Sequence, residues 1–471
     1  MIQQQFAVPS TLNIPLILTS VGRSDQYIYD HQDKYHYVLH KIAEGRVFNK
    51  SMSARSFTNL NKKLLRTVLG IRYTDTVLSD LIDLGIVETD RHHIHGVKSR
   101  GYRIAHEHNT KCVLRDIFKS EVWNAKVQKM HRAYVAKLNH ALATEWGNLS
   151  QIGINALAAT AFIEAKYAQS MKMLDTFKEM LDTQMSGVLT KVNYSRLLVE
   201  SKYWKGIYSL KVLQVVVDEL SRKHNFGITL YQYLQDSITN QYNADLISIE
   251  KIDNEDFFLE QPDPTSRIYT NLTNLSSDLR QFLTHKTMSN MTNMDIMNSQ
   301  PYVFCTLLRE KYKGQELPED VQKYITLTST GKFYEYVMNL LDVPADERKA
   351  FKIQFFAKIF YCQTGYSVRT REGKLFRKEF KNVYALINEY KEESYQNLSI
   401  QMQRTEANII LNSIGDELKK RHIWYSTIHD SVVVLKEHQE EVKHLIIQQF
   451  LRVVGVAPSV KPEDLLGGLG L

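Results

Sequence analysis

The chain of 471 residues is poor in several residue types, and each shortage narrows its class. Its three cysteines, Cys112, Cys305 and Cys362, lie far apart with no CxxC spacing, so we expect neither a cysteine zinc site nor a disulfide framework. Glycine (20) and proline (9) are too sparse for a collagen-like or low-complexity chain. Without an 18-residue apolar run or a signal peptide, we expect a cytoplasmic protein with no membrane span.

What the chain does contain predicts a folded protein with one basic region. Hydrophobic residues make up 43%, which excludes wholesale disorder, and the length is typical of about two to four domains. The net charge of +7 is concentrated, because residues 91–140 hold eleven Lys or Arg against three acids. A clustered basic surface is typical of nucleic-acid binding, and a solvated helical face is the alternative.

Residues 57–104 have the layout of two short helices followed by two strands. Two apolar blocks with helical periodicity are separated by Gly70, and the second is expected to start at a Thr74 or Asp75 cap and to end at Gly85. Strands are expected at 86–88 and 102–104, on either side of a basic loop. The order resembles that of winged helix-turn-helix domains.

That resemblance implies a DNA-docking function for the segment. Residues 75–84 would form the recognition helix in a major groove, and Lys98, Arg100 and Arg103 of the wing would contact phosphates. A small helical adaptor that packs on the rest of the chain is the alternative. The three histidines of the loop are expected on the wing surface, because no Cys or acidic partner stands at metal-ligand spacing.

Residues 110–245 contain no proline and few glycines, and their periodicity predicts a helical subdomain. The clearest helical runs are 156–180 and 194–220. The segment carries no recognisable chemical motif, and its basic start would place a cationic stripe along one helix.

Two aspartates in the last 210 residues stand beside runs that predict strands. Asp295 follows a short run, and Asp430 precedes the stronger β-branched run 431–435. Two carboxylates on adjacent strands can bridge a pair of Mg²⁺ ions about 4 Å apart, which stabilises the attacking and leaving oxygens of phosphoryl transfer. Taken singly, an aspartate in such a position is far more often a surface carboxylate.

Four residues at four-residue spacing predict a helix with one functional face. Arg348 and Lys352 begin this face and could hold a triphosphate, whereas Phe356 and Phe360 follow and could stack on a base. Phenylalanine at helical spacing is more often a core residue. Only the ordered combination of these blocks is specific.

That combination resembles the DNA polymerase I family (family A) and its relatives, the phage-type single-subunit RNA polymerases, over residues 262–435. The resemblance implies a right-hand fold with an antiparallel-sheet palm, helical fingers and a helical thumb. Asp295 matches the metal-binding aspartate of the first palm motif, and His429-Asp430 matches the last, with Asp430 as the second metal ligand. The fingers pattern is R-x3-K-x3-F-x3-Y, in which Phe360 replaces tyrosine and Lys352 would be catalytic.

Further positions follow from the same resemblance. Arg267 matches an arginine that contacts the primer end. Residues 399–410 are similar to the helix that precedes the last motif, so Gln403 would reach template or primer, as would His429. Two Mg²⁺ ions are implied as cofactors, with Mn²⁺ as an alternative.

Departures from the family pattern bear on the choice of sugar. Ser299 and Ser431 are closer to the RNA polymerase pattern. Gln300 stands where DNA polymerases carry a glutamate gate, is expected to contact the nucleotide, and is bulky enough to crowd a 2′-hydroxyl. Phe360 lacks the hydroxyl with which RNA polymerases help to select ribose. The balance favours DNA synthesis, with relaxed sugar selection left open.

We therefore expect an α+β chain with a winged-helix-like domain at 1–108, a thumb-like subdomain at 109–260, and palm and fingers at 261–471. Its expected function is that of a template-directed polymerase acting on nucleoside triphosphates with a DNA template and a primer or RNA transcript, in a mobile element or phage. A single-subunit RNA polymerase or primase-like enzyme, and an inactive DNA-binding initiator or regulator, remain alternatives. An H-D phosphohydrolase is disfavoured because no further His and Asp ligands stand at suitable spacing.

Overall fold

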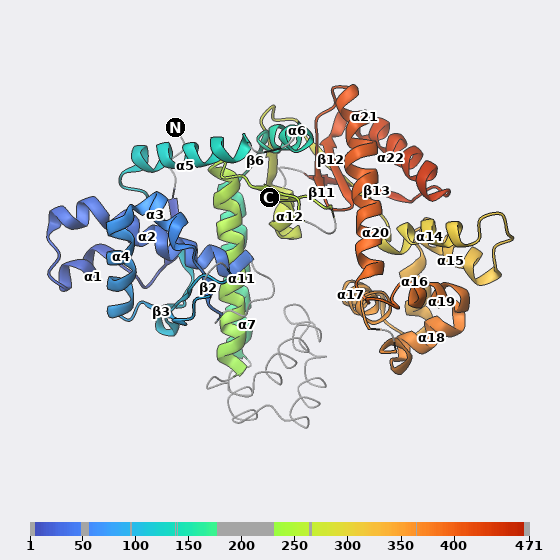
Figure 1. Cartoon of the computed structure of the whole chain (residues 1–471), viewed down its shortest axis with the longest axis horizontal. Helices are drawn as coiled ribbons and strands as arrows, with labels where there is room; N and C mark the ends of the chain where they lie inside the picture. The colour runs from blue at the N-terminus through green and yellow to red at the C-terminus, as the bar shows by residue number, and fades with distance from the viewer. Residues whose placement is uncertain are drawn as a thin grey trace. The chain divides into compact units, whose positions relative to one another are not determined.

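The structure is a computed structural model, and the residues it describes form two compact units of mixed helix and sheet (Figure 1). It describes residues 5–48, 56–94, 97–136, 138, 140–176, 230–262, 266–363 and 365–465. Unit 1 comprises Met1–Ala143, Ile154–Asp256 and Asn274–Leu279, and unit 2 comprises Thr144–Gly153, Phe257–Thr273 and Arg280–Leu471. The expected helical run at 194–220 lies outside the described residues, and the three-domain division stays a prediction.

Unit 1 is mostly helical, with two small sheets. Its elements are β1 (Gln5–Pro9), α1 (Ile14–Ser20), α2 (Asp25–Phe48), β2 (Thr58–Asn59), α3 (Lys62–Leu69), α4 (Ile71–Asp83), β3 (Val87–Thr89), β4 (Gly101–Ile104), η1 (His106–His108), β5 (Cys112–Asp116), α5 (Ser120–Val135), α7 (Ala156–Thr176) and α11 (Leu230–Asp253). β1 pairs with β5, and β2, β4 and β3 form an antiparallel sheet in that order. α6 (His140–Leu149) and β6 (Ile152–Ile154) lie where the chain passes between the units.

The helix expected at 75–84 begins earlier than the sequence predicts. α4 starts at Ile71, directly after Gly70, whose φ of 90° only glycine adopts readily. Thr74 is therefore not a cap: its side chain is buried, and its hydroxyl donates to the Gly70 carbonyl at 2.8 Å. The end is as expected, because Gly85, with φ of 70°, follows the helix and donates its N–H to the Ile82 carbonyl at 2.9 Å.

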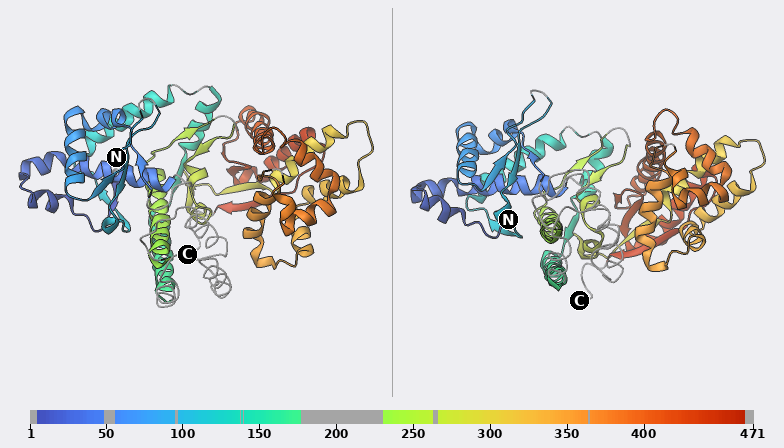
Figure 2. Two further views of the ribbon diagram at one scale, coloured as in Figure 1. Left: turned by 60° about the horizontal axis from the view of Figure 1, so that its bottom comes forward. Right: turned by 90° about the horizontal axis from the view of Figure 1, so that it is seen from below.

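α7 and α11 run side by side in unit 1 (Figures 1 and 2). The Tyr242 hydroxyl on α11 donates to Glu164 of α7 at 2.5 Å, and Lys111 forms an ion pair with the same carboxylate at 2.5 Å. Asn243, which is fully buried, accepts from the Cys112 N–H at 2.7 Å and donates to the Thr110 carbonyl at 3.2 Å. The amide thereby pairs with one backbone N–H group and one backbone carbonyl group at the start of β5.

Unit 2 contains a four-stranded sheet and a set of helices. Its elements are β7 (Leu259–Glu260), β8 (Tyr269–Thr270), β9 (Leu283–His285), β10 (Met291–Ile296), α13 (Ser299–Val303), α14 (Cys305–Lys311), α15 (Glu319–Ser329), α16 (Phe333–Leu340), η3 (Ala345–Glu347), α17 (Arg348–Ile359), η4 (Ser367–Arg369), α18 (Arg371–Glu379), α19 (Lys381–Glu389), α20 (Asn397–Ala407), η5 (Asn408–Ile414), α21 (Gly415–Lys420), β11 (Tyr425–Ile428), β12 (Ser431–Leu435), η6 (Lys436–His438), α22 (Gln439–Val454) and β13 (Val460–Leu465). α12 (Asn271–Asn274) and η2 (Ser277–Phe282) each have residues in both units.

The sheet of unit 2 is antiparallel in the order β11, β12, β10, β13. On β10, Met294 and Ile296 belong to the hydrophobic core, as do Val432 and Val434 of β12. Because side chains alternate across a strand, Asp295 lies on the opposite face. The core continues into a cluster of aromatic side chains, hereafter the aromatic cluster: Phe304, Tyr324, Phe333, Phe355, Phe360, Phe376 and Phe380.

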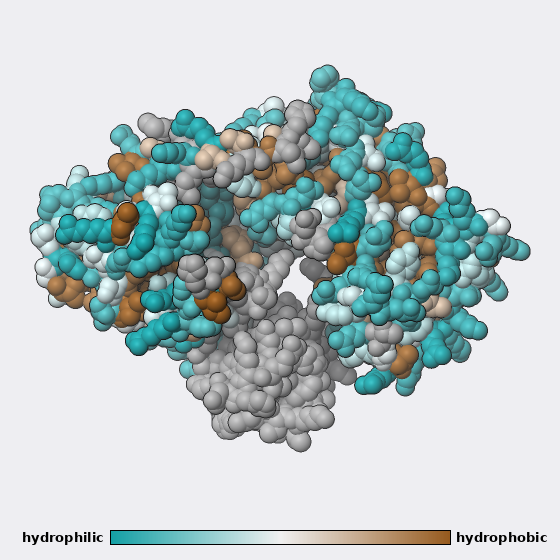
Figure 3. Space-filling view, in the orientation of Figure 1, coloured by the Kyte–Doolittle hydropathy of each residue, from teal (hydrophilic) through white to brown (hydrophobic). Residues whose placement is uncertain are grey.

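Figure 3 shows the hydrophobic residues of the face it draws in small, separate groups among hydrophilic ones. Within the part of the chain that the structure describes, no helix combines the length and the apolar character needed to cross a bilayer.

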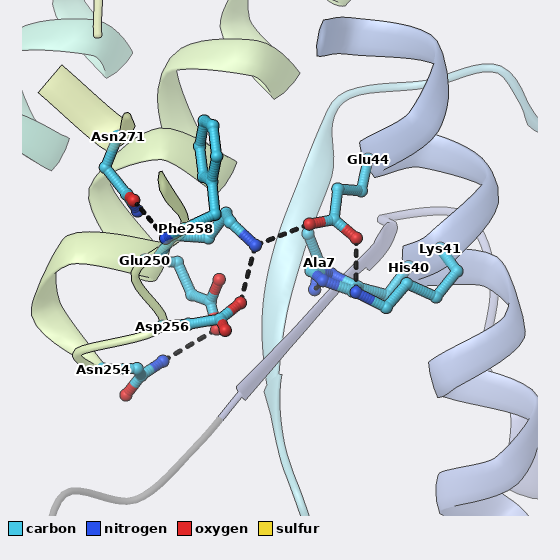
Figure 4. A network of polar contacts seen from close by, with 10 residues as sticks. Ala7, His40, Lys41, Glu44, Glu250, Asn254, Asp256, Phe258 and Asn271 are labelled. Atoms are coloured by element: carbon cyan, nitrogen blue, oxygen red, sulfur yellow. Dashed lines mark hydrogen bonds and ion pairs between the residues drawn. The ribbon is translucent and has the colours of Figure 1, made fainter. Parts of the chain in front are cut away.

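A buried network of charges joins α11 to α2 in unit 1 (Figure 4). The Lys251 ammonium contacts Glu44 and Asp256 at 2.6 Å each, and Glu44 also pairs with Lys41 at 2.5 Å. Burial opposes the charge on Lys251, but the two carboxylates raise its pKa above the usual value. The neighbouring Glu250 has a pKa raised to about 8, because it is buried and close to Asp256.

We predict that Lys251→Met destabilises the protein, because the change leaves the partly buried carboxylates of Glu44 and Asp256 without their shared cation. The expected loss is about 3–5 kcal/mol in the free energy of unfolding, measured by urea denaturation. A loss below about 1 kcal/mol would show that the network contributes little.

We compare this variant with Glu250→Gln, a charge-neutralising change beside the same network. Glu250→Gln should stabilise the protein to an extent that depends on pH. The folded state keeps a proton on Glu250 that the unfolded state releases above its ordinary pKa of 4.5, so wild-type stability falls as pH rises from there to about 8. Glutamine does not titrate and can still accept from Asn254. The variant should match wild type near pH 5 and exceed it by on the order of 2 kcal/mol at pH 8.

Candidate active site

The register of two neighbouring strands brings the two predicted aspartates together. β10 pairs with β12 so that Asp295 lies opposite Ser431, the residue that follows Asp430. β11 and β12 are joined by the two-residue turn His429-Asp430, in which His429 has φ of 54°. Left-handed backbone is typical of such tight hairpins, and for a non-glycine residue it is a strained conformation of the kind found at functional sites.

The Asp430 carboxylate lies close enough to Asp295 for its charge to act on that residue. Burial and the Asp430 carboxylate raise the pKa of Asp295 to about 6, and the Lys352 ammonium opposes this shift. A cation between two such carboxylates would relieve the repulsion. Oxygen donors of this kind fit Mg²⁺, which takes one or two carboxylates and completes its shell with water and phosphate oxygens. Among the described residues, no group of three or more His, Cys, Asp or Glu forms a larger metal-ligand set.

Two charged residues near this pair were not found by sequence reasoning. Arg280 of η2 is largely buried, which lowers its pKa, while the charges of Glu463, Asp430 and Asp295 act on it in the opposite direction. Glu463 lies on β13, where Asn293 rather than Asp295 is its pairing partner on β10. Neither residue stands in a motif, so only the strand register and the path of η2 bring them here.

The helix predicted to start at Arg348 is α17. Its residues Arg348 and Lys352 both lie near one aromatic ring. The Arg348 guanidinium carbon and the Lys352 ammonium each lie 5.9 Å from the centre of the buried Tyr334 ring. Arg348 also donates to Glu335 at 2.5 Å. The positive charge of Lys352 acts to lower the pKa of Asp295.

Phe360 does not have the position that the sequence pattern predicts for it. Its side chain is 0% exposed and lies in the aromatic cluster, stacked on Phe356 with ring centres 4.6 Å apart. A ring with no exposed face cannot stack on a base, so the expected nucleotide contact of Phe360 is wrong for this structure. The helix ends at Ile359, and the half-buried Tyr361 takes the accessible position, where its hydroxyl accepts from Gln403 at 3.3 Å.

A buried carboxylate that the family pattern does not contain organises the other predicted residues. Glu406 of α20 accepts from Arg267, from the Ser299 hydroxyl at 2.6 Å and from the Gln300 amide at 2.5 Å. Burial and Asp430 raise its pKa to about 7, and Arg267 opposes this shift. Arg267 and Gln300, predicted for primer and nucleotide, are thus both held by one side chain. In Figure 1, α20 runs from the sheet of unit 2 towards α17.

Comparison with known proteins gives a likeness at the level of structure and none at the level of sequence family. No protein-family model matches the sequence, and no curated protein does either. The structure is similar to the POL domain of Pol1 from M. smegmatis in complex with DNA primer-template and dNTP, at 11% identity and a TM-score of 0.39, over 74% of each chain. At this TM-score the likeness decides nothing about function, which has to be argued from the site.

The predicted wing in unit 1 is organised by Asp90. This carboxylate accepts from the N–H groups of His92 and Gly101 at 3.0 and 2.9 Å and from Lys98 at 2.9 Å. Although partial burial works against ionisation, these donors lower the pKa of Asp90 to about 2. Gly101 is required here, because a Cβ would lie 2.6 Å from the Asp90 carboxylate. Lys98 therefore has a structural partner in addition to its predicted phosphate contact.

The other cations of the wing differ in their surroundings. Arg103 pairs with Glu88 at 2.6 Å on the neighbouring strand, whereas Arg100 is exposed and its charge acts to lower the pKa of Tyr102. The predicted recognition helix is acidic: α4 carries Asp75, Asp80 and Asp83 against a single cation, Arg72. A helix of this charge is a poor match for a groove lined by phosphates.

We predict that Phe360→Ala acts on stability rather than on nucleotide binding. Loss of the ring leaves a cavity in the aromatic cluster, which should lower the free energy of unfolding by about 3–5 kcal/mol in urea denaturation. The neighbouring control Tyr361→Phe removes only the hydroxyl that Gln403 contacts and should cost about 0.5–1.5 kcal/mol. Equal stabilities for Phe360→Ala and wild type would contradict the buried position.

Proposed function

We propose that the chain is a template-directed nucleic-acid polymerase that transfers nucleotidyl groups with two metal ions. The observation that carries the proposal is the register of β10 and β12, which brings Asp295 and Asp430 from separate motifs to one place with the charge of Lys352 in reach. Carboxylates paired in this way beside a lysine suit phosphoryl transfer. DNA synthesis is the favoured activity.

Each side chain of the site would have a defined task. Asp295 and Asp430 would hold two Mg²⁺ ions, or Mn²⁺; when bound, these ions stabilise the attacking and leaving oxygens. Lys352 would neutralise the triphosphate, and Arg348 would exchange Glu335 for a phosphate. Tyr361 and the half-buried Phe356 offer rings for the base.

RNA synthesis is the second candidate, and one observation favours it. A tyrosine hydroxyl at the end of the fingers helix is expected to help ribose selection, and Tyr361 supplies the hydroxyl that Phe360 lacks. Gln300 works in the other direction, because it is bulky enough to crowd a 2′-hydroxyl. Relaxed sugar selection is the intermediate outcome.

DNA is the proposed macromolecular partner at both units. In unit 2, Arg267, Gln403 and His429 would face primer and template; Tyr269 packs edge-on against the His429 ring, with ring centres 5.4 Å apart. In unit 1 the wing would contact phosphates through Lys98, Arg100 and Arg103. One chain that docks on DNA and copies it suits the replication protein of a mobile element or phage. A catalytically inactive initiator would keep only the docking part.

We predict that Asp295→Ala and Asp430→Ala each abolish Mg²⁺-dependent primer extension. Each change removes a direct metal ligand, so the rate should fall by more than the roughly 100-fold that loss of an outer partner costs. Asp416→Ala, at an exposed helical position paired with Lys419, should extend normally. Extension that persists in either site variant would remove the site assignment, and parallel reactions with dNTPs and rNTPs would settle the sugar.

We predict that Arg100→Ala weakens DNA binding and makes the binding constant less dependent on salt concentration. Loss of one phosphate contact should reduce the slope of log K against log salt by about 0.9, measured by fluorescence anisotropy on duplex DNA. Lys311→Ala, an exposed cation of unit 2 paired with Glu389, is the control. An unchanged slope would place the DNA contact of unit 1 elsewhere than on the wing.

A further inference from the structure

Glu406 is a buried carboxylate that ties together two segments of unit 2. It is fully buried and accepts from three side chains: Arg267, in the segment before β8, and Ser299 and Gln300, at the start of α13. The hydrogen bonds of Ser299 and Gln300 end on one oxygen, and that of Arg267 ends on the other. A buried carboxylate with a cation and two neutral donors is satisfied, and charge-assisted hydrogen bonds of this type are the stronger kind.

These contacts fix the orientation of the Gln300 amide. An ionised carboxylate only accepts hydrogen bonds, so the NH₂ end of the amide faces Glu406 and the carbonyl Oε1 is turned away from it. Among the described residues, no donor reaches this buried Oε1. Glu406 thus determines where the Gln300 side chain lies and which end of its amide is turned away from the carboxylate.

In the proposed site, sugar selection depends on where the Gln300 side chain lies. Gln300 follows Asp295 by five residues and lies in the first turn of α13, the helix that comes after the strand carrying this carboxylate. A side chain that crowds a 2′-hydroxyl discriminates only if it cannot rotate away. Without Glu406, the terminal rotations of Gln300 would be free, and the discrimination would be lost together with the hydrogen bond.

We propose that Glu406 is a positioning residue that sets sugar selection by holding Gln300 against the sugar of the incoming nucleotide. The proposal rests on the proposed polymerase function. Because Glu406 is fully buried and accepts from the Gln300 amide, its effect would pass through Gln300. A merely structural Glu406 would instead change the rates with both sugars equally.

The test compares kcat/KM for one dNTP and the matching rNTP in primer extension by wild type, Glu406→Ala, Gln300→Ala and the double variant. Each single change should lower the dNTP-to-rNTP ratio by on the order of tenfold, the equivalent of one hydrogen bond. Because Glu406 acts through Gln300, the double variant should have the same ratio as Gln300→Ala alone. Glu406→Gln keeps the volume but loses the charge, and should lower the ratio less.

The control is Glu145→Gln, since Glu145 is another buried carboxylate of unit 2, near Tyr425 and outside the proposed site. This change should leave the ratio unaltered. An unchanged ratio in both Glu406 variants, or multiplied losses in the double variant, would overturn the role of Glu406 while leaving the polymerase function intact. Absence of primer extension by the wild type with either sugar would instead overturn the proposed function, and the sugar-selecting role of Glu406 with it.

Discussion

The pairing of β10 with β12 is the interaction on which the rest of unit 2 depends. One face of this pair is apolar and is buried against the helices through Met294, Ile296, Val432 and Val434. A slip of one residue would move those side chains to the other face, so core burial fixes the register. The same register places the carboxylates of Asp295 and Asp430 together, although they repel each other.

The hydrophobic core therefore supports a charge arrangement that is unfavourable by itself. Lys352 offsets part of the repulsion, because its charge lowers the pKa of Asp295. The charges of both aspartates also act on Arg280. The left-handed backbone of His429 adds strain at the same turn. Strain and like charges held in place by their surroundings are typical of functional sites, where a ligand relieves them.

Charge has a different role in unit 1, where much of the basic surplus is paired internally. Four cations of residues 91–140 contact acids of the same unit: Lys98 with Asp90, Arg103 with Glu88, Lys111 with Glu164, and Lys119 with Asp30. A count of charges along the chain cannot show this pairing, because the acids lie elsewhere in the sequence. The positive surface available to a polyanion is smaller than the sequence indicates.

The sequence was sufficient for features that local patterns determine. The strands at Asp295 and Asp430, the helix from Arg348, and the stop at Gly85 all follow from periodicity and turn chemistry, and the structure has them. The metal-binding and nucleotide-binding roles stay predictions.

Features that depend on packing could not be predicted in the same way. Successive residues of a helix differ in direction by about 100°, so the side that a residue faces depends on where the helix ends. α17 ends at Ile359, and beyond it Phe360 is buried whereas Tyr361 is accessible. Glu406 and Arg280 reach the site from segments distant in sequence, and no motif marks them.

The central claim is that Asp295 and Asp430 together hold two metal ions. Its most direct test is anomalous diffraction from crystals of the protein grown with Mn²⁺, primer–template and a non-hydrolysable nucleotide. The account predicts two anomalous peaks about 4 Å apart, both in contact with the two carboxylates. Peaks located elsewhere, with Asp295 and Asp430 free of metal, would contradict it.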